Sequence, residues 1–197
     1  MGNEDLEVDL PLIDPKKDDW NLWALLDEGC NSTCHGEQWR IHAQAVLKRR
    51  GYAPRRLSES KSSFSGIGEV ICTGRWRFPI GLTMEPSTVP VHGTLDSAEL
   101  AGKEAPMLLS LPAQSKLGLI KDMRAGACTL REFPGEYLKM GRDIQTGLLL
   151  VCITHYGNGF YSELEEFDLS NVREVQKAAF VDARSCWNKA HGAGKPR

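Results

Sequence analysis

The chain has 197 residues, of which 41% are hydrophobic and 25% are charged, a composition typical of a globular protein with one core. Its formal net charge of −2 provides no global attraction to nucleic acid or to an anionic membrane surface, so we expect neither as a partner. Because no apolar run is long enough to span a membrane and the first residues are acidic, unlike a secretory signal, we expect an intracellular, cytoplasmic protein.

The acid-rich residues 1–19 contain Pro11 and Pro15, which favours an extended arm or linker in front of a folded domain at residues 20–155. The domain begins with a predicted strand, Trp20–Leu26, which ends in a run of apolar residues and is followed at once by Asp27. A carboxylate at the end of a covered strand is costly to bury without a partner. Either the chain reaches the surface there or the carboxylate has a chemical task.

A helix is predicted over Gln38–Arg50, with Gly51 as its end. One face of this helix is apolar, and the other is rich in arginine and lysine and is followed by Arg55 and Arg56. We interpret the basic face as a solvated surface, and a weaker alternative is a patch that binds a polyanion, such as nucleic acid.

The middle of the chain predicts strands. Arg75–Met84 alternates between apolar and polar residues, and we expect it to form a hairpin with Val70–Cys72 through a turn at Thr73-Gly74. Later predicted elements are a strand at Met107–Leu109, a helix from Pro112 to Asp122, a strand pair that turns at Ala125-Gly126, and a last core strand at Gly147–Ile153. Residues 156–197 are predicted to form a helical extension with a mobile tail.

Three segments in this order resemble the retropepsin family of aspartic proteases, and the closest likeness is to the protease segments of retrotransposon polyproteins. Ala24–Gly29, which reads ALLDEG, is similar to the apolar-apolar-Asp-Thr/Ser-Gly signature of the family. Phe64–Gly68 is similar to its flap, and Pro106–Pro112 with Leu117–Ile120 to its closing strand and helix. The resemblance covers about residues 20–153 and implies a mainly β acid-protease half-barrel with two or three helices, the C-terminal extension included.

The resemblance also implies a function: a homodimeric aspartic endopeptidase that cleaves an extended peptide or polyprotein. Asp27 would be the catalytic residue, and Glu28 and Gly29 would shape the catalytic loop. The flap residues that cover the substrate would be Phe64, Gly66, Ile67 and Gly68. The family's chemistry uses two carboxylates that share a proton, so the second would be Asp27 of another copy. We expect no metal and no cofactor.

Two residues depart from the family pattern. Glu28 stands where the family has Thr or Ser, whose hydroxyl joins the two halves of the dimer. Glu28 could be protonated and bridge the axis, it could turn away to a cation, or the enzyme could be catalytically weak or inactive. The last outcome gives the alternative function, a retropepsin-like module for dimerisation or peptide binding. Ser110 stands where the family usually has Gly, which questions how closely that strand packs near the catalytic loop.

Other candidate sites have less support. Cys30, Cys34 and His35 have part of a zinc-ligand pattern but lack a fourth ligand at an ordinary spacing. A Cys34 nucleophile with His35 or His42 as its base lacks a visible third group to orient the base. Leu95-Asp96 resembles a second signature, but the run upstream of it, His92-Gly93-Thr94, is polar where the family has apolar residues. We expect buried free thiols rather than a disulfide framework for the six cysteines: Cys30, Cys34, Cys72, Cys128, Cys152 and Cys186.

Overall fold

The fold is mainly β, as predicted, and the computed structural model describes residues 9–58, 62–64, 70–88 and 91–156. Two helices occur within these residues, α1 (Glu37–Lys48) and α2 (Leu111–Leu117). The strands of the first half are β1 (Leu12–Ile13), β2 (Trp23–Asp27), β3 (Cys34–Gly36), β4 (Arg55–Ser58), β5 (Ser62–Phe64), β6 (Val70–Leu82), β7 (Met84–Glu85) and β8 (His92–Leu100). The strands of the second half are β9 (Met107–Ser110), β10 (Leu119–Asp122), β11 (Ala127–Leu130), β12 (Tyr137–Leu138), β13 (Met140–Asp143), β14 (Leu149–Cys152) and β15 (Thr154–His155).

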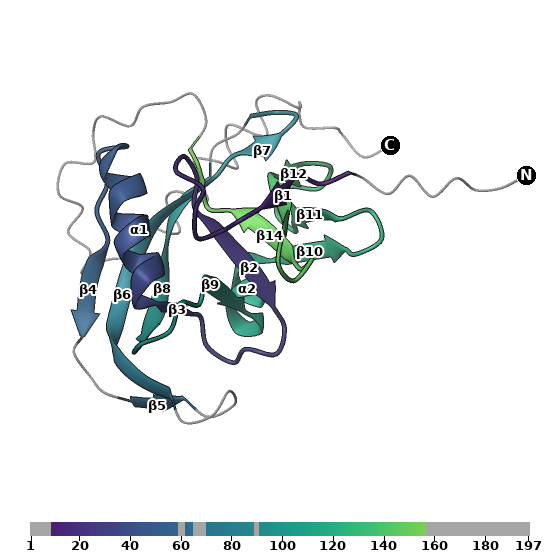
Figure 1. Cartoon of the computed structure of the whole chain (residues 1–197). Coiled ribbons are helices and arrows are strands. Elements are labelled where there is room, and N and C mark those ends of the chain that lie inside the picture. The colour runs from purple at the N-terminus through teal and green to yellow at the C-terminus, as the bar shows by residue number, and fades with distance from the viewer. Residues whose placement is uncertain (1–8, 59–61, 65–69, 89–90, 157–197) are drawn as a thin grey trace, which may run out of the picture.

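Most of the strands belong to one mixed sheet. Its order is β1-β13-β14-β2-β9-β3-β8-β6-β15, and β4 and β5 also pair with β6. Two small two-stranded sheets, β10-β11 and β12-β7, complete the strands of the described residues. Figure 1 shows α1 on one side of the sheet and the β10-β11 hairpin on the opposite side of the molecule.

The centre of the sheet places β2 and β9 side by side. They run parallel, with Leu25 opposite Leu108 and Asp27 opposite Ser110. Because strands buried on both faces read as continuous apolar runs, the WALL and MLL segments suit these central positions. β9 also pairs with β3, so the loop at residues 28–33 must cross the carboxyl end of β9 to connect β2 to β3.

Helix α1 covers one face of the sheet with the side chains that its sequence predicts. Trp39, Ala43, Val46 and Leu47 are each at most 1% exposed, which confirms the predicted apolar face. Trp39 packs edge-on against Phe78 of β6, with a ring-centroid distance of 5.3 Å. Burial of this face holds α1 against the sheet, and α1 begins at the residue that follows β3.

The predicted turn at Thr73-Gly74 was wrong. β6 runs through it as one strand, and a register shift against β8 falls between Cys72 and Gly74. The partner strand explains the difference, because pairing with β8 on both sides of the shift holds the chain extended. A glycine inside a strand often marks a bulge, and the same residue in the sequence alone suggests a turn.

The second helix is shorter than predicted. α2 ends at Leu117, since Gly118 adopts a left-handed conformation (φ 68°) that terminates the helix. The residues expected to complete the helix to Asp122 form β10 instead, and they pair with β11 across the predicted turn at Ala125-Gly126. Gly126 has a positive φ of 63°, as such a turn requires.

The structure describes part of the predicted N-terminal arm but almost none of the predicted C-terminal extension. Leu12 and Ile13, in the predicted arm, add β1 to the sheet by pairing in parallel with β13. The predicted helix in residues 156–197 lies almost wholly outside the described residues. No helix within the described part of the chain combines the length and the apolar character needed to cross a membrane.

Candidate functional site

Asp27 is the last residue of β2, and its side chain is half-buried. Its Oδ1 accepts a hydrogen bond from the backbone N–H of Gly29, at 2.9 Å. A Cβ on Gly29 would lie 3.3 Å from that same oxygen, which is tighter than ordinary contact. The glycine of the Asp-x-Gly motif therefore gives the carboxylate a backbone donor at close range.

Ser110 fixes the loop at residues 28–33 against the start of α2. Its hydroxyl lies 3.1 Å from the hydroxyl of Thr33, and its backbone N–H donates to Thr33 Oγ1 at 3.3 Å. The same hydroxyl caps α2 by accepting from the N–H of Ala113. The N–H of Leu111 donates to the carbonyl of Cys30 at 3.3 Å. The structure thus shows how a serine fits at this position: its side chain is buried and hydrogen-bonded rather than obstructive.

Glu28 is paired with a cation. Its exposed carboxylate accepts a hydrogen bond from Lys121 of β10, and this bond and the charge of Lys121 hold the pKa of Glu28 below its ordinary value. Lys121 also donates to Gln114 of α2 at 2.8 Å. The Gln114 amide donates in turn to the carbonyl of Leu109, at 2.6 Å. Of the three arrangements considered for Glu28, the isolated chain adopts the second.

The predicted flap is only partly described. Phe64 ends β5 and pairs with Val70 of β6, and the two described strands are antiparallel, as the strands of a flap hairpin would be. Gly66, Ile67 and Gly68 lie outside the described residues. At the base of this hairpin, Cys72 packs in one buried cluster with Cys34 of β3, next to the loop that follows Asp27.

The thiols are free, as predicted for those that the structure describes. Cys34, Cys72, Cys128 and Cys152 are buried, Cys30 is half-buried, and Cys186 lies outside the described residues. Burial, reinforced by the neighbouring Cys30, raises the pKa of Cys34 to about 12. That shift is opposite to what a cysteine nucleophile needs.

His35 does not face the cysteines in the way that a base or a zinc ligand would. Its Nδ1 hydrogen-bonds with Ser97 Oγ at 2.7 Å, on β8 beneath α1. Within the described residues, no group of three or more histidine, cysteine or acidic side chains is arranged to hold a metal ion.

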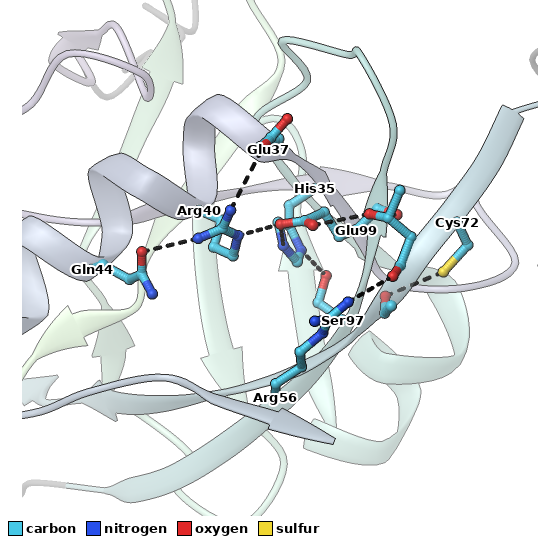
Figure 2. Close-up of polar contacts among 10 residues, drawn as sticks. His35, Glu37, Arg40, Gln44, Arg56, Cys72, Ser97 and Glu99 are labelled. Carbon is cyan, nitrogen blue, oxygen red and sulfur yellow. Dashed lines mark hydrogen bonds and ion pairs between the residues drawn. The ribbon is translucent and has the colours of Figure 1, made fainter. Parts of the chain in front are cut away.

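A buried polar network, which the sequence did not indicate, joins α1 to β3, β6 and β8 (Figure 2). Glu99 is 6% exposed and accepts hydrogen bonds from Arg40 and from Thr73 Oγ1, the latter at 2.9 Å. His35 Nε2 lies 3.9 Å from Glu99 and has no hydrogen-bond partner. Desolvation lowers the pKa of His35 to about 4.

The serine, histidine and glutamate of this network are reminiscent of a hydrolytic triad in composition only. All three are buried, so a substrate cannot reach the serine. The one sequence feature that pointed to this network was Glu99 between two apolar residues, Ala98 and Leu100. That pattern fits an exposed glutamate as well as a buried, paired one, so it did not predict the network. The network is structural and ties α1 to the strand that follows the Asp27 loop.

Part of the basic surface of α1 is engaged in contacts. Arg40 pairs with Glu99 and lies over the ring of Trp76, 4.7 Å from its centroid. Arg49 lies 4.0 Å from the carboxylate of Asp19. These contacts reduce the free positive charge that a polyanion-binding face would use.

Comparisons with protein-family models, with curated proteins and with solved structures gave no match to this chain.

Proposed function

We propose that this chain is one half of a homodimeric aspartic endopeptidase of the retropepsin-like type, with Asp27 as its catalytic carboxylate. The observation that carries the proposal is the placement of Asp27. The residue ends a buried strand within an Asp-x-Gly turn, and its side chain is half-exposed. Among the described residues, its carboxylate accepts one hydrogen bond, from Gly29 N. A carboxylate that ends a core strand, reaches the surface and accepts a single hydrogen bond within the described residues is accessible to a substrate or to a second carboxylate.

The arrangement of the motif segments supports the same function. Ala24–Gly29 and Pro106–Pro112 were similar to two family segments far apart in sequence, and they lie side by side through the pairing of β2 with β9. The loop after Asp27 is bonded to the cap and the first residue of α2, through Thr33 to Ser110 and through Cys30 to Leu111. An anchored loop of this kind would hold the carboxylate in a fixed orientation, as a general acid or base requires.

The mechanism needs a second carboxylate. In the proposed dimer, Asp27 of a second copy lies across a two-fold axis, and the two carboxyl groups share one proton because like charges about 3 Å apart cannot both ionise at low cost. The ionised carboxylate removes a proton from a water molecule as that water attacks the peptide carbonyl. The protonated carboxyl donates a hydrogen bond to the carbonyl oxygen, on which negative charge develops.

The pairing of Glu28 with Lys121 bears directly on this mechanism. Two ionised glutamates beside the aspartate pair would gather four carboxyl groups around one axis, three of them ionised, and raise the cost of assembling the dimer. Lys121 pairs with the carboxylate of Glu28 and compensates its negative charge. The aspartate pair then forms next to a neutralised ion pair rather than an uncompensated anion.

The proposal is tested with the purified full chain and a mixed peptide library. We expect shortened peptides by mass spectrometry at acidic pH, and a dimer by sedimentation under the same conditions. Asp27→Asn should abolish cleavage and leave the circular dichroism spectrum unchanged. The matched control is Asp19→Asn, which alters an exposed acid near α1 and should cleave like the wild type. Equal cleavage by Asp27→Asn and the wild type would overturn the proposal.

A second candidate function is a catalytically inactive module that binds peptides or dimerises. Glu28 favours it, because an ionised glutamate held by Lys121 cannot supply the cross-dimer hydroxyl of the family. In the library experiment, this module retains peptides without shortening them. The variant Glu28→Thr separates the two candidates further. If the wild type does not cleave and the variant does, the chain is a protease that Glu28 has inactivated. If the wild type cleaves and the variant cleaves faster, Glu28 weakens an active protease.

A further inference from the structure

Cys30 and Cys34 enclose the second half of the loop that follows Asp27, and their sulfur atoms are in contact. The two Sγ atoms are 3.9 Å apart. Cys34 is the first residue of β3, is 1% exposed and packs with Cys72, Ala98 and Leu100. Cys30 belongs to the loop and is half-buried, between the exposed residues Gly29 and Asn31.

We propose that Cys30 and Cys34 are a reversible redox pair, which a low-molecular-weight disulfide such as glutathione disulfide converts into an intrachain disulfide. A disulfide requires the two sulfurs to approach to about 2 Å. Because Cys34 is held in the sheet, the loop that carries Cys30 makes that movement. The inference is independent of the proposed protease activity.

The chemistry takes place in two exchange steps. The Cys30 thiolate attacks one sulfur of glutathione disulfide, which breaks the S–S bond, forms a mixed disulfide on Cys30 and releases one glutathione thiolate. The Cys34 thiolate then attacks Cys30 Sγ and releases the second glutathione. The two protons of the protein thiols pass through solvent to the two glutathiones, so two thiols are oxidised and one disulfide is reduced.

The environments of the two thiols set the order of these steps. Burial and the adjacent Cys30 raise the pKa of Cys34 to about 12, so Cys34 is a poor first nucleophile. Cys30 is the accessible thiol, and its Sγ donates to the carbonyl of Ser32 at 2.8 Å. Cys30 therefore reacts first and Cys34 resolves the mixed disulfide, a step that is assisted by proximity.

The other described cysteines lack such a partner. Cys72 is buried and donates to the carbonyl of Gly74, at 3.2 Å. Cys128 and Cys152 lie in two separate apolar clusters. Within the part of the chain that the structure describes, the sulfur–sulfur contact between Cys30 and Cys34 is the one poised for closure.

Closure would change the loop next to Asp27. The carbonyl of Cys30 accepts from the N–H of Leu111, and Gly29 N donates to Asp27 Oδ1. Pulling Cys30 toward β3 strains both contacts. Oxidation is thus expected to alter the surroundings of Asp27 whether or not Asp27 is a catalytic residue.

The test uses the full chain with Cys186→Ser, which removes the thiol outside the described residues. Trypsin cuts after Lys17 and Arg40, so Cys30 and Cys34 share the peptide 18–40, while Cys72 lies in the peptide 62–75. After equilibration with glutathione disulfide, we expect peptide 18–40 to lose the mass of two hydrogens and to regain it with dithiothreitol. Peptide 62–75, with its buried thiol, serves as the internal control.

Two variants identify the roles of the cysteines. Cys30→Ser, at a half-exposed position that tolerates serine, should leave peptide 18–40 unmodified, and Cys34→Ser should stop at a glutathione adduct on Cys30. The proposal is overturned if the Cys186→Ser chain itself stops at that adduct, if peptide 18–40 becomes joined to peptide 62–75, or if no thiol of peptide 18–40 reacts. These readouts require no peptidase activity.

Discussion

Lys121 donates a hydrogen bond to the carboxylate of Glu28, and the two residues are 93 positions apart in the chain. Glu28 directly follows Asp27, so this contact compensates the negative charge that stands next to the candidate catalytic group. Lys121 is itself held by Gln114 of α2 and is 15% exposed at its side chain. A lysine fixed in this way orients the glutamate as well as compensating its charge.

The first prediction concerns the protonation of Glu28. Lys121→Met should raise the pKa of Glu28 toward its ordinary value of 4.5, because the hydrogen bond and the favourable charge are both lost. A pH titration of the side-chain carboxyl carbons by NMR measures this shift. Lys116→Met, which removes an exposed lysine at the end of α2, is the control and should leave the Glu28 pKa where it is. An identical titration of Glu28 in the Lys121 variant would contradict the pairing.

The second prediction concerns Ser110, whose hydroxyl caps α2 and contacts Thr33. Ser110→Ala should lower the free energy of unfolding by about 1–2 kcal/mol, the usual cost of losing an N-cap with a buried hydrogen bond. Urea denaturation at neutral pH measures it. Ser115→Ala, at an exposed position of the same helix, should change the stability by at most about 0.5 kcal/mol. Equal stability of the two variants would argue against the capping role.

The third prediction follows from His35, which is buried and neutral. Its pKa is lowered from 6.5 to about 4, chiefly by desolvation, which the charge of Arg40 adds to and that of Glu99 opposes. The unfolded chain therefore binds a proton between these two pH values that the folded chain does not bind. Stability consequently falls as the pH drops from 6.5 to 4, and the loss from this one group amounts to about 3 kcal/mol.

The variant His35→Gln tests that origin. Glutamine keeps a hydrogen-bonding group near Ser97 but does not titrate, so the free energy of unfolding should fall less steeply between pH 6.5 and 4 than in the wild type. Urea denaturation over a pH series gives both slopes. The comparison is one of slopes, so it holds even if the variant is less stable at neutral pH. Parallel curves would show that His35 is not responsible.

The fourth prediction concerns Gly36, which joins β3 to α1. A Cβ at this position would lie 2.1 Å from the carbonyl oxygen of Lys103 and 2.8 Å from the backbone nitrogen of Ala105. Because both obstacles are backbone atoms, Gly36→Ala should destabilise the fold by several kcal/mol, on the order of 3–5 kcal/mol. Gly93→Ala is the matched control, since its Cβ would make only an ordinary 3.9 Å contact with Ile80. Thermal unfolding of the two variants, followed by circular dichroism, should separate them widely.

The elements that the sequence predicted well are those whose own residues carry the pattern. The apolar face of α1 repeats with the helical period, and the WALL and MLL runs could be covered on both faces only at the centre of a sheet. The errors arose where a partner overrides the local signal. Thr73-Gly74 has the composition of a turn, yet pairing with β8 keeps it inside one long strand.

The candidate site divides in the same way. The sequence alone identified Asp27 as an acid at the end of a core strand, and the family resemblance placed Gly29 in the catalytic loop and marked Glu28 as the position that departs from the family pattern. Only the tertiary structure decided that Glu28 is paired with Lys121, that Cys30 touches Cys34, and that His35 turns to Ser97. The physical reason is that periodicity and turn chemistry are local properties of the chain, whereas the partner of a charge, a thiol or an imidazole depends on which distant segments the packed sheet brings within a few ångströms.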